Sequence, residues 1–294
     1  MNYSILYRGP LKVCNYLCIY CPFIHELKPL RRSRHVSTHL QKDKNALNNF
    51  YNWLKNQNLG KQEKISVFFI PSGEILLFKY YRNLIRKLLL ENFIAKIVVQ
   101  TNLSVSLGDL IPLFDQKLRL WITYHPSKVN MDPFIEKLNH LLQYGIKFSV
   151  GAVGTKENLQ SIQELRNNLN ESIYLWINAA NPSNNYYSKS DLNTIMEIDP
   201  LFKYELQIKH SFNEPCKTGQ SVFFIDEYGN IRRCVLDNEI LGTLENSTLS
   251  QISSKKPCKN FYCQCFIAYV HLVSLSLSDI YSGILERIPL SFDS

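Results

Sequence analysis

The chain has 294 residues, of which 45% are hydrophobic and 20% are charged. This composition is that of a globular protein, and no stretch approaches the roughly 20 uncharged apolar residues that a membrane span needs. The N-terminus lacks the apolar core of a signal peptide, so we expect a cytoplasmic protein, and its formal net charge of +8 directs attention to anionic partners.

Short apolar, β-branched runs predict six strands, which alternate with longer runs of helical period. This alternation is typical of repeated βα units around a parallel sheet. Each predicted strand ends in a polar or Gly/Pro-containing turn, at the sheet edge where parallel α/β folds bind ligands. The predicted strands are residues 3–7, 65–70, 94–100, 118–123, 147–151 and 172–178. Two of the helices between them are predicted at 132–144 and 156–169.

A loop with three cysteines follows the first predicted strand directly, in the pattern Cys14-x-x-x-Cys18-x-x-Cys21. A structural zinc ion requires four ligands. An iron-sulfur cluster held by three thiolates keeps one iron free to bind a substrate or cofactor. Two alternatives stay open from the spacing alone: a zinc site completed by His25 or His35, and three buried thiols without a ligand.

The pattern changes after about residue 205. Two short strands, at 222–226 and 230–233, flank a Glu-Tyr-Gly turn and predict a hairpin. We expect a second, smaller domain at 206–294 beside a larger one at 1–205, with the apolar segment 266–285 as a closing helix.

Five cysteines surround this hairpin, and none lies between Cys21 and Cys216. Thiols in a cytosolic protein stay reduced, so a disulfide framework is not expected and metal binding is favoured. A zinc knuckle remains an alternative, because three of the cysteines with a hairpin cysteine would complete a tetrahedral site. The five are Cys216, Cys234, Cys258, Cys263 and Cys265.

The run CNYLCIYCPF at 14–23 resembles the signature of the radical S-adenosylmethionine (SAM) superfamily. This resemblance implies a partial (β/α)6 TIM-like barrel and a 4Fe-4S cluster on Cys14, Cys18 and Cys21. It also implies that the reduced cluster cleaves SAM into methionine and a 5'-deoxyadenosyl radical. Tyr20, before the third cysteine, would lie by the adenine.

Three later strand ends add to the resemblance. The run PSGE at 71–74 resembles the superfamily's Gly-Gly-Glu element, with Ser72 in place of the first glycine, and implies that Glu74 receives the SAM amino group. The runs QTN at 100–102 and GAVG at 151–154 resemble elements of later strands. Taken singly, each is also typical of a plain turn or a tightly packed connection. The resemblance implies a set of cofactor-binding residues: Tyr20, Ser72, Gly73, Glu74, Thr101, Asn102, Gly151 and Gly154.

The C-terminal cysteine pattern resembles the superfamily's auxiliary-cluster extension, called SPASM in its full form and twitch in its short form. Five cysteines suffice for one auxiliary 4Fe-4S cluster, so we expect the twitch-like form. The first ligands expected are Cys216, Cys234 and Cys263, followed by Cys258 or Cys265. Tyr269 and His271 could face this site, although an apolar segment favours a place in the core for both.

The resulting functional hypothesis is an enzyme that oxidatively modifies a peptide or small metabolite by hydrogen abstraction, with a flavodoxin or ferredoxin-type electron donor. The run YRGPL at 7–11 resembles a little-characterised bacterial branch of the superfamily and indicates no substrate. Because only thirteen residues precede Cys14, any leader-peptide recognition is expected from a separate partner chain.

Two other functions compete with this hypothesis. RNA modification is prompted by the basic charge, but the only tight basic run, at 31–35, has no neighbouring aromatic platform, and no nucleic-acid module follows Cys265. We therefore do not expect nucleic acid as a partner. The remaining alternative is a zinc-binding interaction protein without chemistry of its own.

Overall fold

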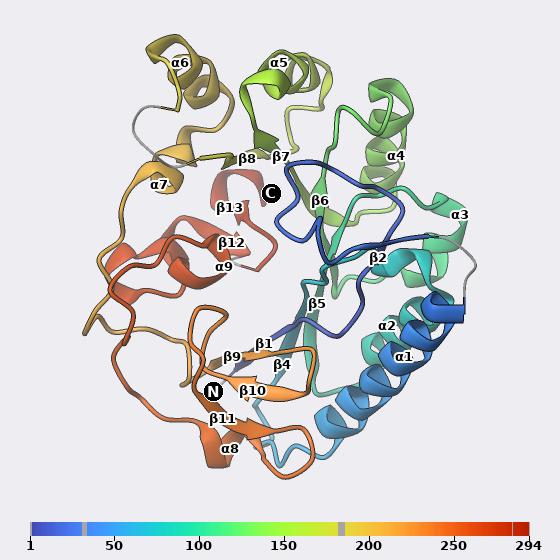
Figure 1. Cartoon of the computed structure of the whole chain (residues 1–294), viewed down its shortest axis with the longest axis vertical. Helices are drawn as coiled ribbons and strands as arrows, with labels where there is room; N and C mark the ends of the chain where they lie inside the picture. The colour runs from blue at the N-terminus through green and yellow to red at the C-terminus, as the bar shows by residue number, and fades with distance from the viewer. Residues whose placement is uncertain (1, 31–33, 182–185, 284, 294) are drawn as a thin grey trace.

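A computed structural model describes residues 2–30, 34–181, 186–283 and 285–293. Residues 31–33 of the predicted basic run therefore lie outside the described residues. The molecule is a mixed α/β structure built on one nine-stranded, mostly parallel sheet (Figure 1). The strand order is β11-β10-β9-β1-β4-β5-β6-β7-β8.

All six predicted strands are present, and each pairs in parallel with its neighbour. They are β1 (Tyr3–Tyr7), β4 (Ile65–Phe69), β5 (Ile94–Thr101), β6 (Leu118–Thr123), β7 (Lys147–Gly154) and β8 (Leu175–Ala179). The predicted glycine turn at 151–154 is wrong, because β7 continues through it. Its ladder with β8 runs as far as the pair Gly154 and Ala179, so both glycines lie within the strand.

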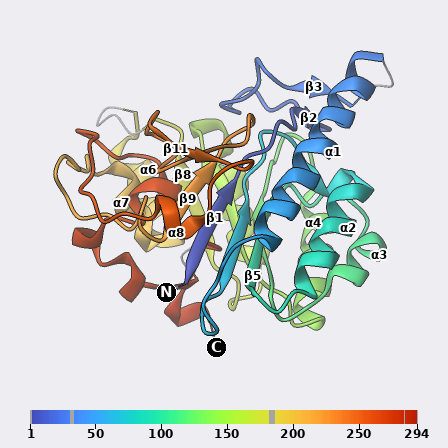
Figure 2. The ribbon, with the colours of Figure 1, turned by 90° about the horizontal axis from the view of Figure 1, so that it is seen from below.

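Helices connect these strands and cover one face of the sheet, as Figure 2 shows for α1 to α4. The helices are α1 (Arg34–Lys55), α2 (Lys79–Leu89), α3 (Leu107–Leu110), α4 (Met131–Gln143), α5 (Leu159–Asn168), α6 (Lys189–Ile198) and α7 (Lys203–Leu206). None of the helices in the described ranges is long and apolar enough to cross a bilayer.

The predicted hairpin forms and joins the same sheet. Its strands are β9 (Val222–Ile225) and β10 (Asn230–Arg232), with β11 (Ile240–Thr243) beside β10. Strand β9 lies parallel to β1, where Val222 pairs with Ser4. Strands from both sides of the predicted domain boundary at residues 205 and 206 thus belong to one sheet. The division into two domains stays a prediction.

The predicted helix at 266–285 is wrong. Among the described residues of this segment, which leave out residue 284, only α9 (Phe266–Tyr269) is an α-helix, and β12 (Tyr281–Gly283) pairs with β13 (Ile288–Pro289) further along. The sequence VSLSL at 273–277 alternates apolar and polar residues with period two, which does not give a helix an apolar face. Ser276 has a left-handed backbone with φ of 48°, which a continuous helix excludes.

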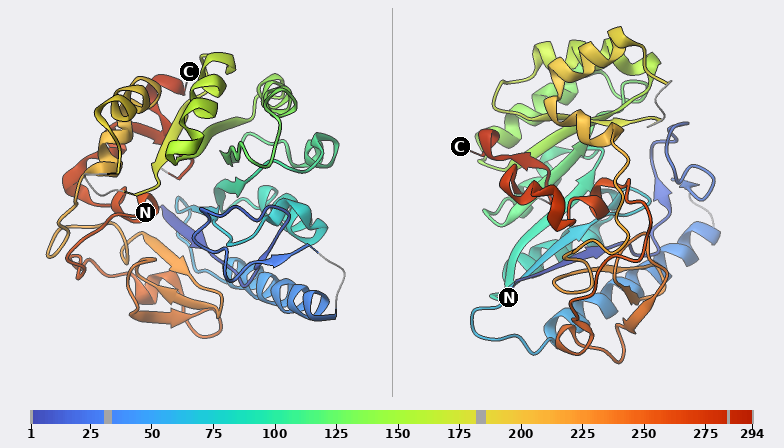
Figure 3. Two further views of the ribbon diagram at one scale, coloured as in Figure 1. Left: turned by 45° about the horizontal axis from the view of Figure 1, so that its top comes forward. Right: turned by 90° about the vertical axis from the view of Figure 1, so that its left-hand side faces the viewer.

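This C-terminal segment covers the face of the sheet opposite the helices (Figures 1 and 3). Successive strand side chains alternate between the two faces, so Phe69 packs under the helices while Phe68 faces the C-terminal segment. The Phe266 ring lies 5.3 Å from the Trp121 ring. Covering both faces is what a parallel sheet requires, and here the chain's own C-terminus covers one of them.

Candidate active site

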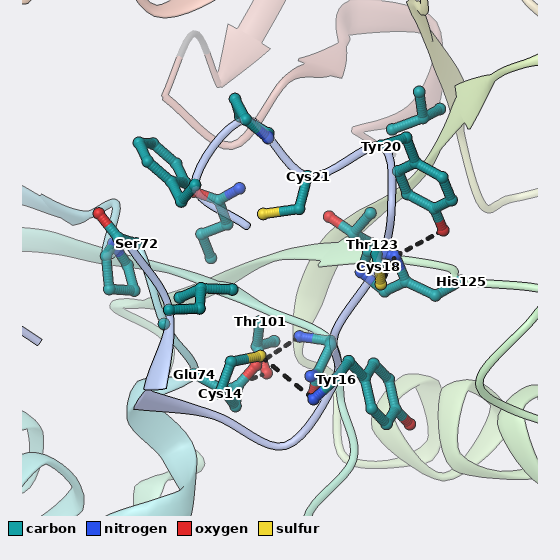
Figure 4. Close-up of a pocket in the computed structure, with 18 of the residues that line it drawn as sticks. Cys14, Tyr16, Cys18, Tyr20, Cys21, Ser72, Glu74, Thr101, Thr123 and His125 are labelled. Atoms are coloured by element: carbon teal, nitrogen blue, oxygen red, sulfur yellow. Dashed lines mark hydrogen bonds between the residues drawn. The ribbon is translucent and has the colours of Figure 1, made fainter. Parts of the chain in front are cut away.

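A cavity of about 210 Å³ opens at the carboxyl ends of the parallel strands, where the sequence predicted the ligand-binding edge. The three-cysteine loop winds around the cavity, and the ends of β4 to β8 form the rest of its lining (Figure 4). The residues that line it and carry the argument below are Cys14, Cys18, Cys21, Tyr20, Ser72, Gly73, Glu74, Thr101, Asn102, His125, Trp176 and Asn178.

The base of the cysteine loop is fixed by two short strands, β2 (Val13–Cys14) and β3 (Lys28–Pro29), which pair in parallel. Gly73 packs directly on this base: a Cβ atom there would lie 2.2 Å from the Val13 carbonyl oxygen. The neighbouring Glu74 N–H donates to the same oxygen at 3.0 Å. The loop therefore sits on the turn after β4, and this contact requires a residue without a side chain.

All three thiols of the loop line the cavity, from three sides of it (Figure 4). They are free thiols, and burial raises the pKa of Cys14 to about 12, so the thiols are protonated until a metal displaces the proton. Within the described ranges, no set of three or more ligating side chains is already close enough to hold a metal ion. Three soft donors on one loop nevertheless suit an iron-sulfur cluster.

Glu74 is almost fully buried, at 2% exposure, yet it lines the cavity. One carboxylate oxygen accepts from the Leu76 N–H and the Thr101 hydroxyl, both at 3.0 Å, and the other accepts from the Asn102 N–H at 2.6 Å. Burial raises the pKa of Glu74 to about 7, against these three hydrogen bonds, which lower it. The side chain therefore ties the end of β4 to the end of β5.

His125 is a cavity residue that the sequence analysis did not single out. Its Nδ1 lies 2.9 Å from the Tyr20 hydroxyl and 3.4 Å from the Cys18 Sγ. Burial, with a smaller contribution from Lys128, lowers the pKa of His125 to about 4, so the ring is neutral near pH 7. Its place directly after β6 was the available signal, because the polar turn after that strand was predicted to face the ligand edge.

The structure brings together most of the predicted cofactor-binding residues. Six of the eight line the cavity, whereas Gly151 and Gly154 do not. A Cβ on Gly151 would lie 2.1 Å from the Trp176 ring, so this glycine makes room for a tryptophan that does line the cavity. Trp176 and Asn178, both on β8, were also missed, because only the fold shows which face of a strand turns toward the cavity.

The five C-terminal cysteines also gather, on the inner face of the sheet. Cys216, Cys234 and Cys263 are buried there, and the other two are half-buried against them. Burial raises the pKa of Cys263, and the charges of the other four thiolates raise it further. Burial raises the pKa of Cys234 to about 12, again with neighbouring thiolates contributing. The five thiols share one cluster, although within the described residues no three ligating side chains are close enough to hold a metal ion.

The prediction that Tyr269 and His271 belong to the core is supported by their exposures of 1% and 3%. The Tyr269 hydroxyl donates to Glu205 at 2.7 Å. The His271 ring lies on a different cavity, at the other end of the strands.

No protein-family model matches the sequence, and neither does any curated protein. Similar solved structures do exist. Native anSMEcpe with bound AdoMet and Kp18Cys peptide superimposes with a TM-score of 0.57 at 17% identity, over 87% of this chain and 81% of that chain. Native anSMEcpe with bound AdoMet and Cp18Cys peptide gives a TM-score of 0.54 at 18% identity, over 85% and 79%. The anSMEcpe protein is a radical SAM enzyme with a SPASM extension.

At these identities the likeness shows the fold. It confirms the expected mixed α/β fold with a large, mostly parallel sheet, since the coverage extends over most of both chains. The chain therefore has the same overall fold as these radical SAM enzyme structures.

Proposed function

We propose that this chain is a radical SAM enzyme that oxidatively modifies a peptide or a small metabolite. One observation carries the proposal: three cysteines of one loop open into the same cavity as Gly73, Glu74 and the end of β5. The thiols and the cofactor-binding residues come from separate parts of the sequence, and the fold brings them together at one strand edge.

Cys14, Cys18 and Cys21 would hold a 4Fe-4S cluster, and the cavity beside them would hold SAM. When bound and reduced, the cluster supplies the electron that splits SAM and generates a 5'-deoxyadenosyl radical for hydrogen abstraction. The fit rests on the donor set, because three thiolates leave one iron open to a further ligand.

The protein's own residues bind and orient the cofactor. Glu74 has three hydrogen bonds on two oxygens, which leaves acceptor capacity for an amino group in the cavity. Gly73 brings the β4 turn against the cysteine loop, so cluster and cofactor sites share one wall. Tyr20 and Trp176 supply aromatic walls that exclude water from a reactive radical.

The finer architecture follows from the same proposal. The strands β1 and β4 to β8 form a partial (β/α)6 TIM-like barrel, and residues 206–294 hold one auxiliary 4Fe-4S cluster of the twitch type. The gathering of five thiols supports this site. An auxiliary cluster can accept the electron left on a substrate radical, which favours an oxidative outcome.

Peptide is the substrate class that the comparisons favour, since two of the similar anSMEcpe structures contain a peptide. The reductant is proposed to be a flavodoxin or ferredoxin-type protein in the cytoplasm. Its acidic surface would complement a chain with a net charge of +8.

The test begins with oxygen-free purification and reconstitution, followed by iron and sulfide analysis. We expect brown protein that forms 5'-deoxyadenosine when dithionite and SAM are added, measured by liquid chromatography and mass spectrometry. Cys18→Ala is expected to abolish this product. Colourless protein with stoichiometric zinc after reconstitution would overturn the proposal.

A matched variant tests the C-terminal cysteines separately from the three-cysteine loop. Cys234→Ala removes an auxiliary thiol and is expected to lower the iron content while leaving 5'-deoxyadenosine formation within about twofold of the parent. Loss of that product in both variants would show that the C-terminal thiols are needed for SAM cleavage itself.

A further inference from the structure

A second cavity, of about 650 Å³, lies at the opposite end of the parallel strands from the proposed active site. Its floor is a row across three neighbouring strands, where Ser4 pairs with Ser66 and Ser66 pairs with Lys96. The same strands carry apolar side chains further along this face, so the change to polar residues is local. The walls come from the turn before β9 and from the C-terminal segment.

The cavity is positively charged. Lys217 and Lys255 are exposed and line it, and within the described residues neither makes an ion pair. Lys96 is held by Glu286, both of whose oxygens lie 2.8 Å from its Nζ. No carboxylate is among the described side chains that line the cavity, so the charge of the two free lysines is uncompensated there.

A buried imidazole also lines this cavity, and one of its two ring nitrogens has no hydrogen-bond partner within the described residues. His271 is 3% exposed, and its Nε2 has no hydrogen-bond partner within the described structure. Its position is fixed, because its carbonyl oxygen accepts from the Lys217 N–H at 3.0 Å. Burial, and then Lys217, lower the pKa of His271 to about 3, so the ring is neutral and has one N–H to donate.

The hydroxyl groups complete a set of donors. Five serines line the cavity together with the lysines and the imidazole. Ser278 and Ser282 already donate to Asp279 and to the Ile288 carbonyl, which leaves the hydroxyls of Ser4, Ser66 and Ser221 as donors to a ligand. Ammonium groups, hydroxyls and a neutral imidazole N–H all donate to anionic oxygens, and a phosphate group offers several such oxygens. The volume exceeds what a phosphate ion fills, so there is room for the organic part of an ester.

We propose that this cavity is a binding site for a phosphate-bearing small molecule, with Lys217, Lys255 and His271 as donors to the phosphate. The site is separate from the three-cysteine cavity and does not depend on SAM or a cluster. Its test therefore stands or falls independently of the proposed function.

The test is equilibrium dialysis of the intact chain with inorganic phosphate, glucose 6-phosphate and ribose 5-phosphate, with glucose as the uncharged comparison. We expect saturable binding of the two esters, competition by inorganic phosphate, and no binding of glucose. The double variant Lys217→Gln/Lys255→Gln is expected to weaken ester binding at least tenfold, because two charge-assisted hydrogen bonds are lost.

The control changes the same total charge elsewhere. Lys79→Gln/Lys87→Gln alters two exposed lysines of α2 on the other face of the sheet and is expected to leave the affinity unchanged. Equal weakening in both double variants would show a nonspecific charge effect and overturn the site. Binding of inorganic phosphate without either ester, or no saturable binding of any probe, would also overturn it.

Discussion

At the scale of single residues, Glu74 joins two strand ends at the cavity. A buried carboxylate that accepts three hydrogen bonds stabilises the arrangement only while all three donors are in place. Two of these donors are backbone groups of the turns after β4 and β5. The residue expected to bind SAM is therefore also the one that shapes the wall against which SAM would lie.

At Gly73 the cysteine loop lies so close to the turn after β4 that one added methyl group would push the two apart. Gly73→Ala would place its Cβ 2.2 Å from the Val13 carbonyl oxygen, and backbone on both sides cannot yield without moving the cysteine loop. We expect cluster incorporation to fall several-fold, measured as iron per chain and absorbance near 420 nm after reconstitution.

The matched control for this change is Gly60→Ala. Its Cβ would approach nothing closer than 3.5 Å, and that neighbour is the flexible Glu63 side chain. Iron content in this variant is expected to equal that of the parent. If both variants reconstitute equally well, the close approach at Gly73 does not position the loop.

At the scale of elements, a buried carboxylate joins α1 to α2. Asp43 on α1 is fully buried and accepts from the hydroxyls of Tyr80 and Tyr81 on α2, at 2.6 and 3.0 Å. It also accepts from the backbone of Leu11, in the segment that leads to the cysteine loop. Asp43 thus joins α1, α2 and the segment that leads to the proposed cluster site.

The titration of Asp43 predicts a pH dependence of stability. Burial raises its pKa from 3.8 to about 6 in the folded state, despite the three hydrogen bonds. The folded state therefore binds the proton more tightly, so the stabilisation is full below pH 3.8 and is lost as the pH rises through 6. Relative to Asp43→Asn, the parent is expected to lose up to about 3 kcal/mol of unfolding free energy between pH 4 and 7.

Urea unfolding of both proteins across this range measures the difference directly. Asp132→Asn, at an exposed position on α4, is the control and is expected to track the parent at every pH. Parallel curves for the parent and Asp43→Asn would show that this carboxyl does not titrate between the two states.

The elements that the sequence predicted correctly are those with strong local signals. The βα units could be predicted because their apolar periods are clear, and the hairpin because its turn is. The segment 266–285 was mispredicted because its alternating serines have no local preference that outweighs tertiary contacts. At the site, the cysteines could be predicted from their spacing in the sequence. His125 and Asn178 could be identified as cavity residues only from the direction of their strands and the face on which they lie.

At the scale of the whole molecule, ion pairs join the C-terminal segment to the inner face of the sheet. Glu286 lies between Lys96 and Arg119, and Asp293 pairs with Lys147, so acidic residues of the C-terminal segment meet basic residues of three strands. Such pairs fix the register in which the segment docks. This docking places a wall of the second cavity on the face of the sheet that also carries the five C-terminal cysteines.

The most deeply buried of these contacts joins Arg287 to Glu205. The guanidinium is 1% exposed and lies 2.9 Å from the carboxylate, while its other terminal nitrogen donates to Asn178 at the proposed active site. Arg287→Met would leave Glu205 buried without its counterion, which is expected to cost about 3 to 5 kcal/mol of unfolding free energy. The double variant Arg287→Met/Glu205→Gln is expected to recover at least about 1 kcal/mol of that loss, because no unpaired charge then remains.

The unfolding free energies of the parent and of these variants are measured by urea unfolding, followed by tryptophan fluorescence. Trp176 reports on this region because its ring lies 4.8 Å from the Arg287 guanidinium. The comparison is Lys259→Met, which breaks an exposed ion pair with Glu239 and is expected to cost less than about 1 kcal/mol. If the two buried substitutions proved additive, the pair would not be coupled. Arg287 and Glu205 would then contribute to stability independently of each other, and the C-terminal segment would be held by its apolar contacts and by the ion pairs of Glu286 and Asp293.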